Sequence, residues 1–136
     1  LEILYQIRKA CFDVQDYICP QTKRIMAQVQ EKYGNRLEYL WEKSPDTAVL
    51  RHEGNQKWYA VLMRISWDKL EKGREGQVEA VNLKQDQVSD LLVKKGIYPA
   101  FHMNKRYWIS VTLDDTLSDE GILELMEKSW NLTSKK

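Results

Sequence analysis

The chain of 136 residues has little cysteine, proline or glycine and no long apolar run. A membrane-spanning helix needs about 20 consecutive apolar residues, so the sequence predicts none. The first residues lack the basic start and apolar block of a signal peptide. With two cysteines, Cys11 and Cys19, the chain cannot build a disulfide framework. These absences favour a reducing, cytoplasmic setting and no contact with a membrane.

The chain also lacks an excess of charge of one sign, which sets it apart from strongly basic nucleic-acid-binding proteins. Its 21 basic and 20 acidic residues give a formal net charge of +1. The charge is uneven, because residues 47–106 carry 11 basic and 7 acidic residues, a net charge of +4. Residues 107–136 carry 3 basic and 6 acidic residues, a net charge of −3. A modestly basic middle segment therefore precedes an acidic C-terminal segment.

Apolar periodicity predicts helices at the start of the chain. An apolar face of helical spacing covers residues 1–12, and Pro20 ends that pattern because its ring cannot continue a helix interior. A second helix is predicted from Thr22, which can cap it. Gly34 is expected to end this helix because glycine tolerates the left-handed conformation.

Strand patterns dominate the rest of the chain. The predicted elements are strands at 47–51, 57–65 and 77–83, a helix at 86–95, a hairpin of strands at 100–103 and 106–113, and a last helix after the cap Ser118. Local strand partners with flanking helices predict an α+β fold with a mostly antiparallel sheet. Residues 1–35 are predicted to be a helical preface to a domain over residues 36–136, the two together forming one compact unit.

Several blocks of the sequence resemble one protein family. The first half of the resemblance is carried by Lys32-Tyr33-Gly34, Tyr39-Leu40-Trp41 and Asn55-Gln56-Lys57-Trp58-Tyr59-Ala60. The second half is carried by Asn82-Leu83-Lys84, Pro99-Ala100-Phe101-His102-Met103-Asn104-Lys105 and Ser129-Trp130-Asn131-Leu132-Thr133. In their order and spacing these blocks, which span residues 32–133, resemble the MmcQ/YjbR family.

The resemblance implies a frataxin/CyaY-like fold, in which an antiparallel sheet carries helices on one face. It also implies DNA binding, because members of the family are usually called DNA-binding proteins after a pair of loops, the double wing. The expected partner is then double-stranded DNA. The expected role is that of a non-enzymatic DNA-binding or regulatory protein.

Basic side chains on or near the predicted hairpin are the candidates for contacts with DNA phosphates. They are Arg51, Lys57, Lys84, Lys105 and Arg106. His102, Asn104 and Trp108 are the candidates for base or ligand contact, and Asn104 is expected to take the positive φ of a tight turn. Two alternatives stay open. The turn could be an ordinary polar hairpin tip, and Trp58 and Trp108 could pack in the core instead of stacking on bases.

A second hypothesis is a module that binds a small ligand or a protein partner in a pocket between the sheet and the hairpin. His102, Asn104, Trp108 and Trp41 would line this pocket, a mix of polar and aromatic side chains that suits the orientation of a ligand. The hypothesis is motivated by the net charge near zero together with 5 Trp and 7 Tyr.

The sequence lacks the common motifs for catalysis and metal binding. It has no Gly-rich phosphate loop, no C-x-x-C and no H-E-x-x-H. Its two histidines, His52 and His102, could hold a metal only by meeting a carboxylate such as Glu53 or Asp68. We therefore expect no enzymatic activity, no cofactor and no metal site.

Overall fold

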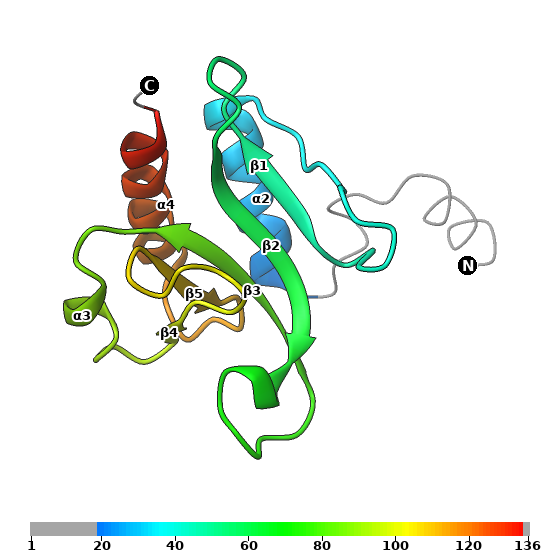
Figure 1. The fold of residues 1–136 in the computed structure, drawn as a ribbon, viewed down its shortest axis with the longest axis vertical. Helices are drawn as coiled ribbons and strands as arrows, with labels where there is room; N and C mark the ends of the chain where they lie inside the picture. The colour runs from blue at the N-terminus through cyan, green and yellow to red at the C-terminus, as the bar shows by residue number, and fades with distance from the viewer. Residues whose placement is uncertain (1–18, 135–136) are drawn as a thin grey trace.

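The computed structural model describes residues 19–134 of the chain. Its strands form one five-stranded antiparallel sheet in the order β1–β2–β3–β5–β4 (Figure 1). The elements are α2 Pro20–Tyr33, β1 Ala48–Arg51, β2 Trp58–Ser66, η2 Trp67–Lys69, β3 Gln77–Lys84, α3 Val88–Leu91, β4 Ile97–Pro99, β5 Trp108–Thr112 and α4 Asp119–Thr133. The predicted α+β class and antiparallel sheet are confirmed. The helix predicted over residues 1–12 lies outside the described residues.

The core lies between the sheet and the helices α2 and α4, which run behind the strands in Figure 1. Ile25 of α2 and Ile122 of α4 belong to one buried cluster with sheet residues such as Leu62, Val81 and Ile109. Alternation along the strands sends these sheet residues to the helix side and their neighbours to the opposite face. Helix α2, which falls within the predicted preface, therefore contributes to the core of the domain. Among residues 19–134, no helix combines the length and apolar character needed to cross a membrane.

The ends of the two long helices follow local chemistry. Helix α2 begins at Pro20, not at the predicted Thr22, because proline suits the first turn, where its missing N–H is not needed. It ends at Gly34, whose φ of +75° places it in the left-handed region, as predicted. The predicted cap of α4 is also confirmed, because the Ser118 hydroxyl accepts the Gly121 N–H at 3.0 Å.

The predicted hairpin of strands 100–103 and 106–113 is wrong in its first strand. The partner of β5 is β4, which pairs Ile97 with Val111 and Pro99 with Ile109. Pro99 ends this edge strand because it has no N–H to donate to a ladder. Residues 100–107 form a loop between the two strands.

The helix predicted at 86–95 is a single turn, α3, over Val88–Leu91. After Leu92 the chain bends back, because the Lys94 N–H donates to the Leu91 carbonyl at 3.0 Å in a tight turn. Gly96, with a φ of +88°, completes the reversal and leads directly into β4. The need to return to the sheet shortens the helix.

Candidate functional site

Four of the predicted interface residues meet at one edge of the sheet. β1 ends and β2 begins there, so Arg51 lies opposite Trp58. β3 ends and β5 begins at the same edge, so Lys84 lies opposite Trp108. Because β2 and β3 are paired neighbours, the two pairs lie side by side. Antiparallel pairing therefore gathers two cations and two tryptophans that are far apart in the sequence; we call this the loop edge of the sheet.

The loop of residues 100–107 folds over the sheet face that points away from α2 and α4 (Figure 1). The Asn82 side chain, which is 1% exposed, anchors it by donating from its amide to the Phe101 carbonyl at 2.9 Å. The Ser110 hydroxyl accepts the Phe101 N–H at 3.0 Å. His102 follows at the surface with a φ of +60°. Two buried polar side chains of the sheet therefore fix the place of the exposed His102.

Asn104 organises the tip of this loop from within. Its side-chain oxygen accepts the Arg106 N–H at 2.9 Å, and its carbonyl accepts the Trp108 N–H at 3.0 Å. The positive φ predicted for Asn104 is wrong, since the left-handed residue of the loop is His102. Lys105 and Arg106 are exposed at the tip. The loop thus presents two cations, while the Asn104 oxygen is committed to the turn.

The five predicted phosphate contacts differ in their surroundings. Arg51 forms a two-pronged ion pair with Glu38, at 2.9 Å from Nε and 2.6 Å from Nη2. A phosphate would have to displace that carboxylate, which makes Arg51 a poor contact. Lys57 is exposed in the turn between β1 and β2, and Lys84 is half-buried at the end of β3. Lys57, Lys84 and the two tip cations remain as candidates.

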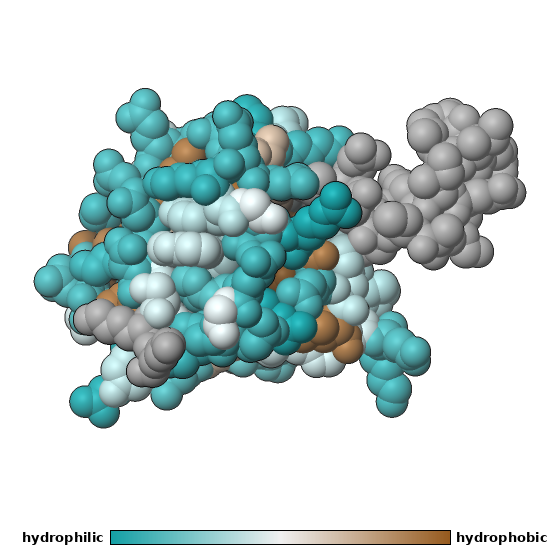
Figure 2. All heavy atoms as spheres, turned by 90° about the horizontal axis from the view of Figure 1, so that it is seen from above, coloured by the Kyte–Doolittle hydropathy of each residue, from teal (hydrophilic) through white to brown (hydrophobic). Residues whose placement is uncertain are grey.

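The end of the molecule that carries the β1–β2 turn and the last turn of α4 is mainly hydrophilic. Figure 2 views this end and shows brown only in small, separated patches. A surface of this kind suits a polar partner better than an apolar one.

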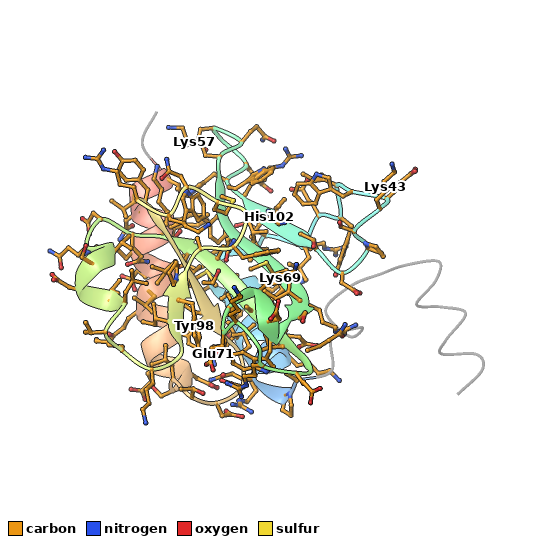
Figure 3. All side chains as sticks on the ribbon, turned by 60° about the horizontal axis from the view of Figure 1, so that its bottom comes forward. Lys43, Lys57, Lys69, Glu71, Tyr98 and His102 are labelled. Carbon is orange, nitrogen blue, oxygen red and sulfur yellow. The ribbon has the colours of Figure 1, made fainter. Side chains whose placement is uncertain are left out.

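Several charged side chains of the loop between β2 and β3 make contacts within the molecule. Arg74 pairs with Glu71 at 3.1 Å, and its guanidinium lies 3.5 Å from the centre of the Trp67 ring. The Tyr98 hydroxyl donates to Glu71, and the two side chains meet in Figure 3. Burial, together with that carboxylate, raises the pKa of Tyr98 to about 12. The loop is thus held to β4 and offers few free cations at its surface.

The two histidines lie in different environments. His52 is buried, with its Nε2 at 2.8 Å from the Thr133 hydroxyl and its ring centre 4.0 Å from that of Trp130. Burial lowers its pKa. Within residues 19–134, no three His, Cys, Asp or Glu side chains lie close enough together to hold a metal ion. His52 therefore has a packing role, and His102 is the histidine exposed at the surface.

A cavity of about 520 Å³ opens beside His102, between the loop of residues 100–107 and the segment of residues 41–47. Trp41 and Trp58 form one wall, with their ring centres 5.6 Å apart in an edge-to-face arrangement. Val61 and other apolar residues of β2 form the floor. Asn104 and Trp108, expected in the lining of such a pocket, lie outside it.

Comparison with known proteins identifies the family. The family model described as YjbR matches residues 30–132. The chain belongs to the YjbR family. The uncharacterized protein YyaQ of Bacillus subtilis is 40% identical over 111 residues, which cover 80% of this chain and 94% of YyaQ. The uncharacterized protein YbdF of Escherichia coli is 40% identical over 58 residues, which cover 40% of this chain and 48% of YbdF.

Solved structures of similar proteins share the fold. A crystal structure of a Pseudomonas syringae protein superposes with a TM-score of 0.79 at 42% identity and covers 82% of this chain and 97% of its own. The Deinococcus radiodurans protein DR2400 has a TM-score of 0.60 at 21% identity over 82% of this chain and 79% of its own, a likeness of fold alone. The resemblance to the YjbR family in the sequence is thereby confirmed.

Sequence reasoning named Trp41 and His102 as lining of a pocket, and both line the cavity, but it missed other residues that shape it. Asn82 and Phe101 lie in blocks that carry the family resemblance, but their roles in the cavity, like that of Met63, depend on the pairing of β2, β3 and β5. One signal was available, because Asn82 is a polar residue between the apolar residues Val81 and Leu83. Buried polar side chains in strands commonly hold a specific neighbour in place.

Proposed function

We propose that this YjbR family protein binds double-stranded DNA at the loop edge of the sheet, as a non-enzymatic, cytoplasmic protein. The observation that carries the proposal is the convergence of cations from separate segments on that edge. Lys57 comes from the β1–β2 turn, Lys84 from the end of β3, and Lys105 and Arg106 from the tip of the loop before β5. Phosphates spaced along a duplex favour such a dispersed set of cations, of which Lys84 is half-buried and the others are exposed.

The exposed His102 is the candidate for contact with a base edge. Its backbone is anchored through Phe101, so the imidazole would be presented without ordering a free loop. The half-buried Trp58 and Trp108 support the edge from below and do not need to stack on bases. Phosphate contacts therefore supply most of the affinity in this proposal, and His102 supplies the sequence preference.

Fluorescence anisotropy with a short labelled duplex tests the proposal. Four neutralised phosphates predict a slope of about −3.6 for the logarithm of the association constant against the logarithm of the salt concentration. The double variant Lys105→Glu, Arg106→Glu should lower the affinity by about tenfold or more and reduce the slope by about half.

The matched control is Lys69→Glu, Lys72→Glu, which makes the same two-site charge reversal in the loop after β2. β2 has 9 residues and so holds that loop roughly 30 Å from the loop edge. This control should retain wild-type affinity. An affinity that does not depend on salt, or an equal loss in both double variants, would contradict the proposed interface.

A further inference from the structure

The cavity beside His102 has the size and lining of a small-molecule site. Pockets for such ligands commonly measure about 300–1,000 Å³, and this one measures about 520 Å³. Its apolar and aromatic lining consists of Trp41, Trp58, Val61, Met63, Ile65, Phe101 and Met103. Trp41 remains 38% exposed, a large indole left without full cover at the mouth. A flat apolar molecule inserted against the two indoles would complete this packing.

The wall of the cavity is formed in advance by the fold. Asn82 and Ser110 hold Phe101 by its carbonyl and its N–H, at 2.9 and 3.0 Å. Asn82 and Ser110 also hydrogen-bond to each other beneath the loop. His102, directly after Phe101, is kept in the left-handed region at a φ of +60°. A strained residue held by a buried polar network is a common feature of binding sites.

The charges at the mouth indicate the kind of ligand. The charged side chains in the lining are Lys43, Arg64 and Asp46, of which Asp46 pairs with Arg64 at 3.5 Å. Lys43 forms no ion pair with any residue of the described part of the chain. Figure 3 shows Lys43 and His102 on separate loops. A cation and an imidazole at the mouth favour an anionic group on the ligand.

We propose that this cavity binds a small molecule with a flat apolar body and one anionic group. The apolar body would lie against Trp41 and Trp58, and the anionic group would face Lys43. The cavity shares His102 with the proposed DNA interface. The proposal can still be tested apart from DNA binding, because neither Lys43 nor Val61 belongs to the proposed DNA contacts.

NMR titration with anilinonaphthalene sulfonate, an aromatic anion with a flat naphthalene ring, tests the proposal on the full chain. The 5 Trp side chains give separate indole N–H signals. Those of Trp41 and Trp58 should shift and saturate with one equivalent bound. The signals of Trp67 and Trp130, which lie outside the cavity, should stay in place. Uncharged phenylnaphthylamine, which has the same rings without the sulfonate, should bind more weakly.

Two variants with matched controls separate shape from charge. Val61→Phe fills the floor of the cavity and should remove the saturable shifts. Val93→Phe should not, because Val93 lies between α3 and β4, is 84% exposed and does not line the cavity. Lys43→Glu should weaken sulfonate binding by about threefold to tenfold, whereas Lys23→Glu on α2 should leave it unchanged.

The same titrations can also contradict the proposed site or the proposed class of ligand. Shifts spread evenly over all the indole signals, or binding that survives Val61→Phe in a folded protein, would overturn the site. Equal affinity for the charged and uncharged probes would overturn the anionic class of ligand. Anisotropy with labelled DNA on Val61→Phe should be unchanged, so failure of the cavity is distinguishable from failure of the DNA proposal.

Discussion

His102 shows how much a single backbone conformation can matter. Its φ of +60° brings Cβ close to the following carbonyl, at a cost of roughly 1 kcal/mol. His102→Gly should therefore raise the free energy of unfolding by about 0.5 kcal/mol, after allowance for the larger entropy of glycine in the unfolded chain. Thermal unfolding followed by circular dichroism should show a rise in Tm of about 2 °C.

Asn104→Gly is the control for this prediction, because Asn104 has no positive φ and its side chain accepts the Arg106 N–H. This change should lower the free energy of unfolding by about 0.5–1 kcal/mol. A larger gain in stability from Asn104→Gly than from His102→Gly would contradict the backbone conformation of the loop.

The sequence predicts a polar turn here but assigns the positive φ to Asn104, because asparagine adopts it more readily than most residues. Hydrogen bonds to the sheet place the positive φ at His102 instead. Both backbone polar groups of Phe101 bind side chains of β3 and β5, so the chain must turn sharply at the next residue, His102. Such long-range hydrogen bonds carry no local sequence signal.

At the scale of elements, Glu79 joins the start of α2 to the sheet. This carboxylate is 2% exposed and accepts the Thr22 hydroxyl at 2.7 Å and the Cys19 N–H at 3.1 Å. It also pairs with Arg64 of the neighbouring strand at 3.2 Å. One side chain of β3 therefore satisfies groups from a helix end and from β2.

Loss of this carboxylate should loosen α2. Glu79→Ala removes a principal partner of Arg64 and of the Thr22 hydroxyl at a site with little access to water. The free energy of unfolding should therefore fall by about 3 kcal/mol. Thr22→Val removes one hydrogen bond alone and should cost about 1 kcal/mol. Urea unfolding of both variants gives the comparison. Equal losses in the two variants would show that the ion pair with Arg64 contributes nothing.

The sequence predicted helix ends correctly where the residue at the end determines it. It failed where the pairing of another element determines the end. Gly34 and Ser118 mark helix ends through their own chemistry, and the structure agrees with both predictions. The helix predicted at 86–95 was too long because the chain must turn back at Gly96 to pair β4 with β5. The apolar periodicity of the sequence does not indicate that the chain must turn back there.

For the whole molecule, the sequence predicts the α+β class and the family. It also suggested that Arg51, Lys57 and Lys84 could lie near the predicted hairpin, and the pairing of the strands brings Arg51 and Lys84 to one edge of the sheet. It could not predict that Arg51 is engaged by Glu38, since Glu38 lies in an irregular segment that reaches β1 through a single bridge to Val49. The ion pair with Glu38 therefore removes Arg51 from the set of proposed DNA contacts, through a pairing that only the folded chain reveals.

The stability of the whole fold should depend on pH through His52, where the β1–β2 turn meets the end of α4. Burial against Trp130 lowers the pKa of His52 below its ordinary value of 6.5. The unfolded chain then binds the proton more tightly than the folded chain does. The stabilising contribution of the neutral His52 side chain is complete above pH 6.5. It is lost as the pH falls through that value toward the lower pKa of the folded state.

Urea unfolding at a series of pH values measures this loss. The free energy of unfolding should decline between about pH 7 and pH 5, a window above the titration of ordinary carboxylates. The pKa values of Asp119 and Asp86 are lowered by their hydrogen bonds to Arg24 and Lys128, so these groups titrate below the window. His52→Gln should be less stable at pH 7, because it loses the ring contact with Trp130, yet it should show a flat profile across the window. A decline in His52→Gln as steep as in the wild type would assign the pH dependence to another group.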